Sequence, residues 1–318
     1  MDGESGKMAN YRIVAALLVT GIIIALLMGS LNSSNTTAMN GKDWTVTDEG
    51  ILAYSVSMPQ YNLSGPINDG NATLATVQFQ SRDMQMAGLL RIPMPARTVQ
   101  NSTTKAGRVP GIVLLPGATV TKEREQGLAK YLAGLGYATL TLDQRNLGAI
   151  DPKSDLQLFM ETREPTEHKM VYDALAAAAI LRVQQGIDPD RIVYAGESIG
   201  GRFAIIACAL DAKARGVLAI STSGYGTDAA VAAAGLTDKD TIRFYRSIDP
   251  ETYLSKIAPR PLALIHSSND HVIPYQLAEK TYTMASMPKS FDTVSCTKHG
   301  YCTDMNGYIE KRLLTMVS

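Results

Sequence analysis

Apolar runs and helix-forming stretches alternate along the chain from Val109 to its end. Runs rich in Val, Ile and Leu are typical of strands buried on both faces of a sheet, and they stand here at 111–115, 137–143, 191–195, 216–221, 261–266 and 290–295. Stretches with apolar residues at helical spacing lie between and after them, at 122–136, 167–185, 202–210, 275–285 and 303–317. Repeated strand and helix units predict an α/β fold, in which a mostly parallel sheet carries helices on both faces. Such a sheet binds its ligands at the carboxyl ends of its strands.

Two further strands are predicted ahead of these units. Residues 73–79 and 86–92 are largely apolar and are joined by a polar segment, which favours an antiparallel hairpin. We therefore predict a main domain at 74–318 that is built on an eight-stranded sheet. Residues 32–73 are rich in Asn, Ser, Thr, Gly and Asp and are expected to form a mostly irregular stalk, with local structure near WTV and ILAYSV.

The N-terminal part of the chain has a different composition. Residues 13–31 carry no charge, and no charged residue occurs between Arg12 and Lys42. At ~1.5 Å per residue this run matches a ~30 Å hydrocarbon core. We expect a single-pass transmembrane signal anchor, with residues 1–12 in the cytoplasm and the main domain outside it. A signal peptide that is removed by cleavage is the alternative.

Five N-x-S/T sequons lie between this apolar run and the first buried strand, and none follows. Their asparagines are at positions 32, 35, 62, 71 and 101. Such acceptors are typical of surface loops in exported chains, although a linker rich in Asn, Ser and Thr also produces them by composition alone. The sequons agree with an exported glycoprotein.

Charge and repeats exclude other classes of protein. The 318-residue chain has 30 Lys plus Arg and 30 Asp plus Glu, without a long run of one sign. Nucleic acid is therefore not an expected partner. No repeat with a period of tens of residues occurs, and the sequence does not indicate an oligomeric state.

The segment GESIGG, residues 196–201, joins the predicted strand at 191–195 to the predicted helix at 202–210. The pattern G-x-S-x-G is weak by itself, but a buried strand before it and a helix after it form the setting of a nucleophile elbow. Its glycines permit a sharp turn and a close approach of helix to strand. We expect Ser198 to be a nucleophile, and the alternative is a Gly-rich turn with an incidental serine.

A serine nucleophile needs a base, and the base needs an acid that orients it. After a nucleophile elbow the chain supplies first the acid and then the histidine. The next plausible acid is Asp270, and two of the four histidines, His271 and His299, follow it. His271 adjoins Asp270 in the sequence, whereas His299 stands in the loop after the last predicted strand. Asp270 and His299 are therefore the expected partners of Ser198.

From Val109 onward the chain resembles the α/β-hydrolase superfamily, especially its dienelactone-hydrolase-like and prolyl-oligopeptidase-like serine hydrolases. The resemblance rests on GIDPDRIVYAGESIGG, PLALIHSSNDHVIP and KHG. It implies an α/β-hydrolase fold with Ser198 as nucleophile, Asp270 as acid and His299 as base. The family usually has a glycine after the strand-end His266, where this chain has Ser267.

An oxyanion hole requires backbone N–H groups that point at the developing negative charge. Ile199, at the N-terminus of the predicted helix, is the first expected donor. The second should follow GIVLLPG, where Ala118 is our choice and Thr119 is its neighbour. The family usually has His-Gly at this point, whereas this chain has Pro116-Gly117.

Cys296 and Cys302 flank His299 at three residues on either side. In an exported domain a disulfide between them would restrict the loop that carries the imidazole. Two unpaired thiols are the alternative, and a Cys/His metal site lacks an evident fourth ligand. Cys208 is expected in the core.

Other polar residues have structural interpretations. Asp143 is expected to be structural, and Arg145 is a candidate for lining the pocket. Glu197, beside the nucleophile, either tunes the site or simply packs or faces solvent. His266 is expected to cap a strand end, and His168 is expected at a solvent-accessible helix start.

These features predict a membrane-anchored serine hydrolase that cleaves a carboxylic ester, or an amide, through an acyl-enzyme. The expected substrate is a small-molecule ester or a short peptide, and no metal or organic cofactor is required. A serine peptidase of the prolyl-oligopeptidase type and a non-catalytic surface-binding protein that retains the fold are the alternatives. Residues 223–256 are expected to form a small lid over the site.

Overall fold

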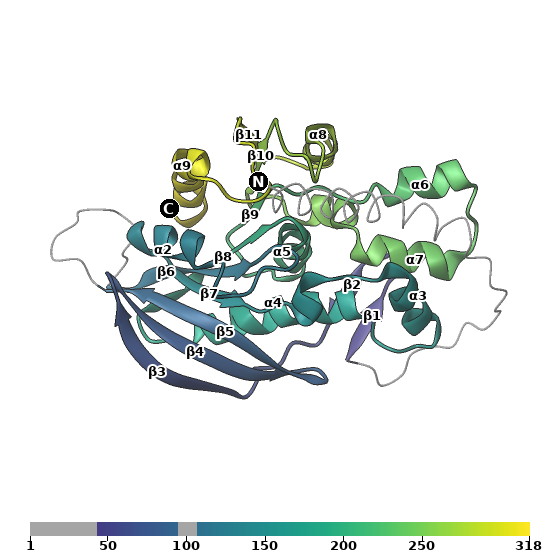
Figure 1. Cartoon of the computed structure of the whole chain (residues 1–318). Helices are drawn as coiled ribbons and strands as arrows, with labels where there is room; N and C mark the ends of the chain where they lie inside the picture. The colour runs from purple at the N-terminus through teal and green to yellow at the C-terminus, as the bar shows by residue number, and fades with distance from the viewer. Residues whose placement is uncertain (1–42, 95–106) are drawn as a thin grey trace, which may run out of the picture.

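A nine-stranded sheet forms the centre of the computed structural model, which describes residues 43–94 and 107–318 (Figure 1). The strand order is β11-β10-β9-β8-β6-β7-β5-β4-β3. Six neighbouring strands run parallel, namely β6 (Val109–Leu115), β7 (Ala138–Leu142), β8 (Ile187–Glu197), β9 (Val217–Ile220), β10 (Leu262–Ser267) and β11 (Lys289–Val294). Three antiparallel strands extend the sheet beyond β7, namely β3 (Tyr61–Asp69), β4 (Ala72–Ser81) and β5 (Met84–Pro93). The predicted mostly parallel α/β sheet is confirmed.

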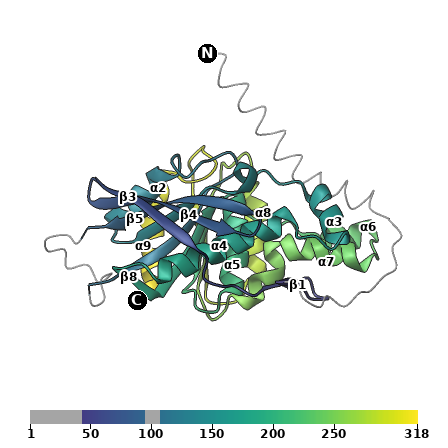
Figure 2. The ribbon, with the colours of Figure 1, turned by 90° about the horizontal axis from the view of Figure 1, so that it is seen from below.

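The parallel strands are buried on both faces because helices cover each face. In β6, Ile112 and Leu114 belong to the core on one face, and Val113 and Leu115 belong to the core on the other. The helices α2 (Gln126–Gly134) and α9 (Asn306–Val317) cover the first face. The second face is covered by α4 (Thr166–Arg182) and α5 (Ile199–Leu210), which lie side by side in Figure 2. A fifth helix, α8 (Tyr275–Met284), packs beside β10 and β11.

The region expected to be a mostly irregular stalk contains three strands, two of them at the WTV and ILAYSV segments where local structure was expected. The third strand joins the main sheet, so the sheet has nine strands rather than the predicted eight. The strands β1 (Trp44–Val46) and β2 (Leu52–Tyr54) form an antiparallel pair, and β3 joins the edge of the main sheet. Most residues of β3 are exposed. An edge strand of this kind lacks the apolar alternation that marks a half-buried strand, which explains why its sequence resembles a linker.

The segment 223–256 forms two helices and a 3-10 turn between β9 and β10. These are α6 (Thr227–Ala234), α7 (Lys239–Ile248) and η2 (Pro250–Lys256). The loop between β7 and α4 holds a further helix, α3 (Pro152–Met160), whose N-cap Asp151 accepts the Ser154 amide hydrogen bond. The helices α3, α6 and α7 gather at the right-hand end of the molecule in Figure 1, where α7 contacts both α3 and α6.

The apolar run at 13–31 and the sequons at 32, 35 and 101 lie outside the described residues. The two other sequon asparagines, Asn62 and Asn71, are exposed on β3 and on the turn that follows it. Within residues 43–94 and 107–318, none of the helices has both the length and the apolar character that a membrane crossing requires.

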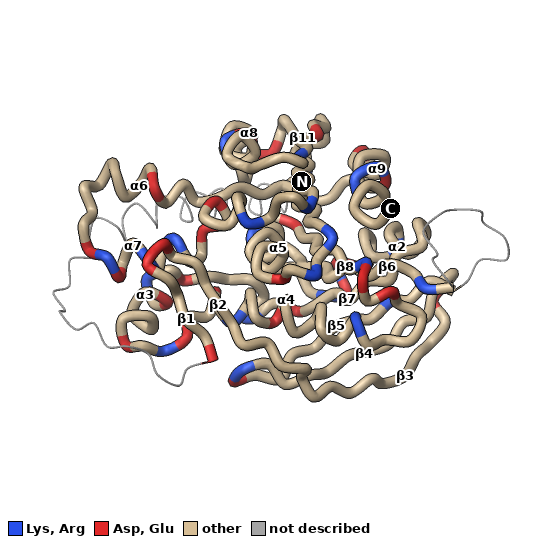
Figure 3. The backbone as a smooth tube through the Cα atoms, turned by 180° about the vertical axis from the view of Figure 1, so that it is seen from behind, with Lys and Arg blue, Asp and Glu red and all other residues tan. Residues whose placement is uncertain are grey.

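Acidic and basic residues are interspersed over the described elements, as Figure 3 shows. Several of them form close pairs, such as Arg312 with Asp292 at 2.6 Å and Arg182 with Asp211 at 2.5 Å. Charges of both signs thus occur over the described part of the fold, many of them in such pairs.

Candidate active site

Ser198 lies on a strained turn between β8 and α5. Its backbone has φ 53° and ψ −120°, a conformation that residues other than glycine rarely adopt. A Cβ atom at Gly200 would overlap the Leu115 carbonyl oxygen, and one at Gly196 would overlap the backbone of Gly200. The two glycines therefore let the start of α5 pass directly over β6 and β8, as a nucleophile elbow requires.

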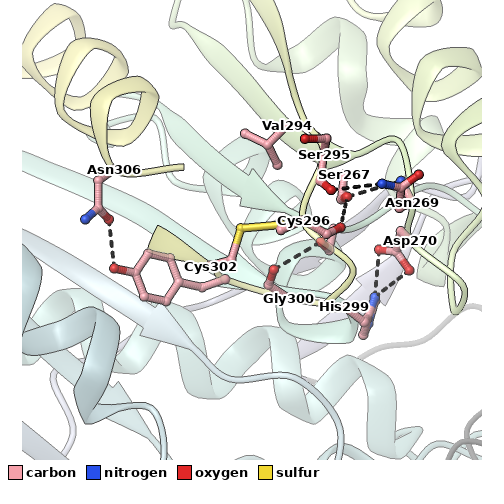
Figure 4. The surroundings of a disulfide bond; sticks show 12 residues. Ser267, Asn269, Asp270, Val294, Ser295, Cys296, His299, Gly300, Cys302 and Asn306 are labelled. Carbon is pink, nitrogen blue, oxygen red and sulfur yellow. Dashed lines mark hydrogen bonds and ion pairs between the residues drawn. A yellow bond between two sulfur atoms is a disulfide. The ribbon is translucent and has the colours of Figure 1, made fainter. Parts of the chain in front are cut away.

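Asp270 and His299 meet at the carboxyl ends of β10 and β11 (Figure 4). His299 Nδ1 lies 2.8 Å from Asp270 Oδ2 and 3.0 Å from Oδ1. The Asp270 carboxylate also accepts hydrogen bonds from the amides of Val272 and Ile273 at 2.8 and 3.0 Å. Burial acts to raise the pKa of Asp270, but the hydrogen bond and charge of His299, together with the two amides, hold that pKa below its ordinary value. Asp270 is therefore an ionised group that orients the imidazole.

The second imidazole nitrogen of His299 is available for proton transfer. His299 Nε2 is buried and has no hydrogen-bond partner among the residues that the structure describes. Since Nδ1 faces Asp270, a neutral imidazole would carry its proton on Nδ1 and its lone pair on Nε2. The side chain of His299 is 21% exposed, whereas its Nε2 atom is buried.

The two expected oxyanion donors lie together beside Ser198. A Cβ atom at Gly117 would be 3.5 Å from Ser198 Cβ, and one at Gly148 would be 3.1 Å from Ala118 Cα and 3.4 Å from Ile199 Cγ2. The other candidate, Thr119, donates its amide to Leu147 O at 2.7 Å. This bond engages the Thr119 amide and favours Ala118 as the second donor.

The loop that carries His299 is closed by a disulfide between Cys296 and Cys302 (Figure 4). Ser267, the residue that departs from the family pattern, donates its hydroxyl to Cys296 O and so ties β10 to the base of this loop. The remaining cysteine, Cys208, is a buried thiol in α5, and burial raises its pKa to about 12.

The prediction for Asp143 agrees with the structure, and the prediction for Arg145 does not. Asp143 accepts hydrogen bonds from the amide and from Nζ of Lys122, at 2.9 and 2.5 Å, and is structural as expected. Arg145 does not line a pocket, because it is buried in ion pairs with Asp173 and Asp83, each at 2.7 Å.

Two further histidines are buried, and one of them, His266, also lies near Asp270, with its Nε2 3.6 Å from Asp270 Oδ2. His168 is fully buried and bonds Ser247 Oγ at 2.6 Å, so the expectation of solvent access was wrong. His266 lies at the end of β10, where its Nε2 bonds Ile273 O at 2.9 Å, which agrees with a strand-end role.

The sequence did not indicate a role for two buried residues near the site, Gln144 and Glu125. Gln144 donates its side-chain amide to Pro116 O and thereby holds the loop that precedes Ala118. Its position two residues after the end of β7 was a usable signal, because ligands bind at the carboxyl ends of the parallel strands. Glu125 is 4% exposed at the start of α2. An acidic residue at a helix start is ordinary, so its sequence position carried no such signal.

The fold, the strained serine elbow and the Asp270–His299 pair define an α/β hydrolase. The sequence pattern of the dienelactone hydrolase family matches residues 96–312. The chain belongs to that family.

Individual relatives are distant. The chain is 30% identical over 139 residues to the uncharacterized protein YfhR of Escherichia coli strain K12, a match that covers 42% of this chain and 47% of that protein. The chain thus spans about half the length of the curated relatives it matches.

Solved structures show the same fold at low sequence identity. Acetyl xylan esterase 1 from a Thermoanaerobacterium species matches with a TM-score of 0.61 at 14% identity, covering 82% of this chain and 89% of that one. A glucuronoyl esterase from Solibacter usitatus matches with a TM-score of 0.58 at 14% identity, covering 94% and 92% of the two chains.

Proposed function

We propose that the protein hydrolyses a carboxylic ester through an acyl-enzyme formed on Ser198. His299 acts first as general base and then as general acid, and Asp270 orients its imidazole. The observation that carries this proposal is the Asp270–His299 pair, with its short Nδ1 contact of 2.8 Å and its unpartnered Nε2 among the described residues.

The proposed reaction has two halves. Ser198 Oγ attacks the ester carbonyl carbon while its proton passes to His299 Nε2. The amides of Ile199 and Ala118 donate to the oxyanion of the tetrahedral intermediate. His299 returns the proton to the leaving alkoxide, and the alcohol departs. A water molecule then loses a proton to His299 and attacks the acyl carbon, which releases the carboxylic acid and restores the Ser198 hydroxyl.

An ester is favoured over a peptide as the substrate. The family assignment and the esterase names of both structural neighbours support this preference. A dipeptidyl amide substrate remains the alternative for a peptidase of the same mechanism, and the two classes are distinguished by direct assay.

The test combines a probe with a substrate panel. A fluorophosphonate should label the folded protein at Ser198, as located by peptide mapping, and Ser198→Ala should abolish both labelling and hydrolysis of p-nitrophenyl acetate. Faster cleavage of dipeptidyl amides than of short p-nitrophenyl esters would overturn the ester assignment. Absence of labelling in folded protein would favour a surface-binding protein that retains the fold.

The segment 223–256 is proposed to shape the substrate-binding side of the site. Its connection to the nucleophile helix supports this role: Arg202, one turn beyond Ser198, donates Nε to Ser223 O at 2.8 Å and lies over the Tyr225 ring at 4.0 Å. Exchanging α6 for a short Gly-Ser linker should change the chain-length preference among p-nitrophenyl esters while leaving fluorophosphonate labelling in place.

The location of the protein is also a proposal. The uncharged run at 13–31 supports a membrane anchor with the enzyme domain on the extracytoplasmic side, and the exposed Asn62 and Asn71 are accessible as glycan acceptors. Retention of the native protein in carbonate-washed membranes, with a mass shift after glycosidase treatment, is the expected result.

A further inference from the structure

The carboxylate of Glu197 links the nucleophile to the loop of the base. Glu197 is the last residue of β8 and is bonded directly to Ser198. Its Oε2 accepts a hydrogen bond from the Tyr301 amide at 2.8 Å, across 104 residues of sequence. Tyr301 follows His299 by two positions, so this single contact spans from the serine residue to the histidine loop.

The intervening residue must be glycine for this contact to form. Gly300 has φ +85°, and a Cβ atom there would overlap Glu197 Oε2. On its other side Gly300 O faces the Ser221 hydroxyl at 3.5 Å. The centre of the loop is therefore held between Glu197 and Ser221, while the disulfide joins its ends.

Glu125 places a second carboxyl group against Glu197. The Glu125 side chain is 4% exposed and does not cap its own helix, and burial, together with the charge and hydrogen bonding of the Glu197 carboxylate, raises the pKa of Glu125. Its Oε1 has no partner among the residues that the structure describes. Burial of Glu125 and the neighbouring charge of the half-buried Glu197 both disfavour an ionised Glu125, so its carboxyl group keeps its proton.

The proton belongs on Glu125. Glu197 Oε2 accepts the Tyr301 N–H, and a protonated Glu125 is able to donate its hydroxyl to the same side chain. Burial, followed by the charge and hydrogen bond of Glu197, raises the pKa of Glu125 well above its ordinary range, and only Lys298 of the histidine loop acts against this shift. Tyr301 is the other titratable group beside Glu197, and burial raises its pKa as well.

We propose that Glu197 and Glu125 form a proton-sharing pair that positions the His299 loop relative to Ser198, with Glu197 as the positioning residue and Glu125 as its protonated partner. The inference rests on the proposed function, since it assigns a role at the same site. When Glu125 loses its proton at alkaline pH, two carboxylates repel each other, Glu197 shifts, and the loop loses its central contact. The rate of ester hydrolysis then falls.

The test uses the full-length protein, p-nitrophenyl acetate between pH 6 and pH 10, and hydrogen exchange at the Tyr301 amide. Glu197→Ala should lower kcat by about 10²-fold, the loss typical of a displaced catalytic group, with little change in KM. It should speed Tyr301 exchange by about tenfold or more, as loss of a charged hydrogen bond implies. Glu197→Gln keeps an acceptor oxygen and should recover most of both losses.

The proton is tested by Glu125→Gln, which keeps a donor toward Glu197 but cannot ionise. Its kcat should lack the alkaline fall that the wild-type protein shows. The matched control is Glu279→Gln, an exposed carboxylate on α8, which should retain the wild-type pH profile.

Three results overturn the proposal: an unchanged kcat in Glu197→Ala, an unchanged Tyr301 exchange rate in that variant, or the wild-type alkaline fall in Glu125→Gln. If the wild-type protein and Ser198→Ala are equally inactive toward esters, the proposed function fails instead. The Tyr301 exchange rate then still decides whether Glu197 holds the loop.

Discussion

Asp270 faces His299 with both of its carboxylate oxygens, at 2.8 and 3.0 Å from Nδ1. The same carboxylate is held from behind by the amides of Val272 and Ile273. These amides fix the carboxylate after β10, and the carboxylate in turn fixes the tautomer of the imidazole. The pair is thus oriented by the backbone before any substrate arrives.

Asp270→Asn should lower kcat for p-nitrophenyl acetate by about 10⁴-fold, because an amide at this place favours the wrong tautomer of His299. The asparagine oxygen still accepts from the two amides, so the free energy of unfolding should change little. Asp304→Asn, at an exposed carboxylate, is the control. A variant at position 270 with kcat within tenfold of wild type would rule out the orienting role.

Gly200→Ala at the elbow and Gly127→Ala on α2 should have opposite effects on the free energy of unfolding, because of the two glycines only Gly200 lies against other backbone atoms. Gly200→Ala should destabilise the fold by about 1–3 kcal/mol or more, since the added Cβ meets the backbone of Leu115 rather than a movable side chain. Gly127→Ala, on α2, has no neighbouring atom within 4 Å and should stabilise the helix by about 0.5–1 kcal/mol. Urea denaturation of both variants measures the difference, and equal effects would count against the close crossing of α5 over β6.

Reduction of the Cys296–Cys302 disulfide should loosen the catalytic loop. The double variant Cys296→Ser, Cys302→Ser should lose about 2 kcal/mol of stability and a several-fold part of kcat. Dithiothreitol should lower Tm and kcat of the wild-type protein but not of the double variant, which serves as its control. Two reactive thiols at these positions without reductant would contradict the prediction.

Buried His168 predicts a loss of stability in acid. Burial lowers its pKa to about 3 in the folded protein, against about 6.5 in an unfolded chain. Between pH 3 and pH 6.5 the unfolded state therefore binds a proton that the folded state does not bind. The free energy of unfolding falls as the pH falls from 6.5 toward 3.

His168→Gln, which cannot titrate in this range, should remove this contribution. Between pH 7 and pH 5 the free energy of unfolding should fall by about 2 kcal/mol more in the wild-type protein than in the variant. Urea titrations at the two pH values measure this difference. Parallel losses in the two proteins would show that His168 is not the group responsible.

Most elements that the sequence predicted have apolar periodicity within their own residues, and the missed strand does not. The six parallel strands, the hairpin and the helices that cover the sheet follow from apolar periodicity within each segment. Strand β3 escaped because its exposed residues carry no such periodicity. Helix α3, which lies before α4, was not predicted, although Asp151 and Pro152 form an ordinary helix start.

The predictions for His168 and Arg145 failed for a different reason. His168 and Arg145 are polar, and a sequence pattern assigns such residues to solvent or to a site. Their burial depends on partners elsewhere in the chain: Ser247 lies 79 residues from His168, and Asp173 lies 28 residues from Arg145. A buried polar group is stable only where such partners satisfy it, and local sequence does not reveal them.

The sequence alone determined the parallel α/β architecture and the elbow at Ser198, because each depends on residues that are close together in the chain. The order of serine, acid and histidine came from the resemblance to a known family. Tertiary structure decided which groups touch. The contact of Asp270 with His299 spans 29 residues, and that of Glu197 with Tyr301 spans 104. Contacts of this length depend on strand order and on the packing of loops at the sheet edge, which are properties of the whole fold rather than of any one segment.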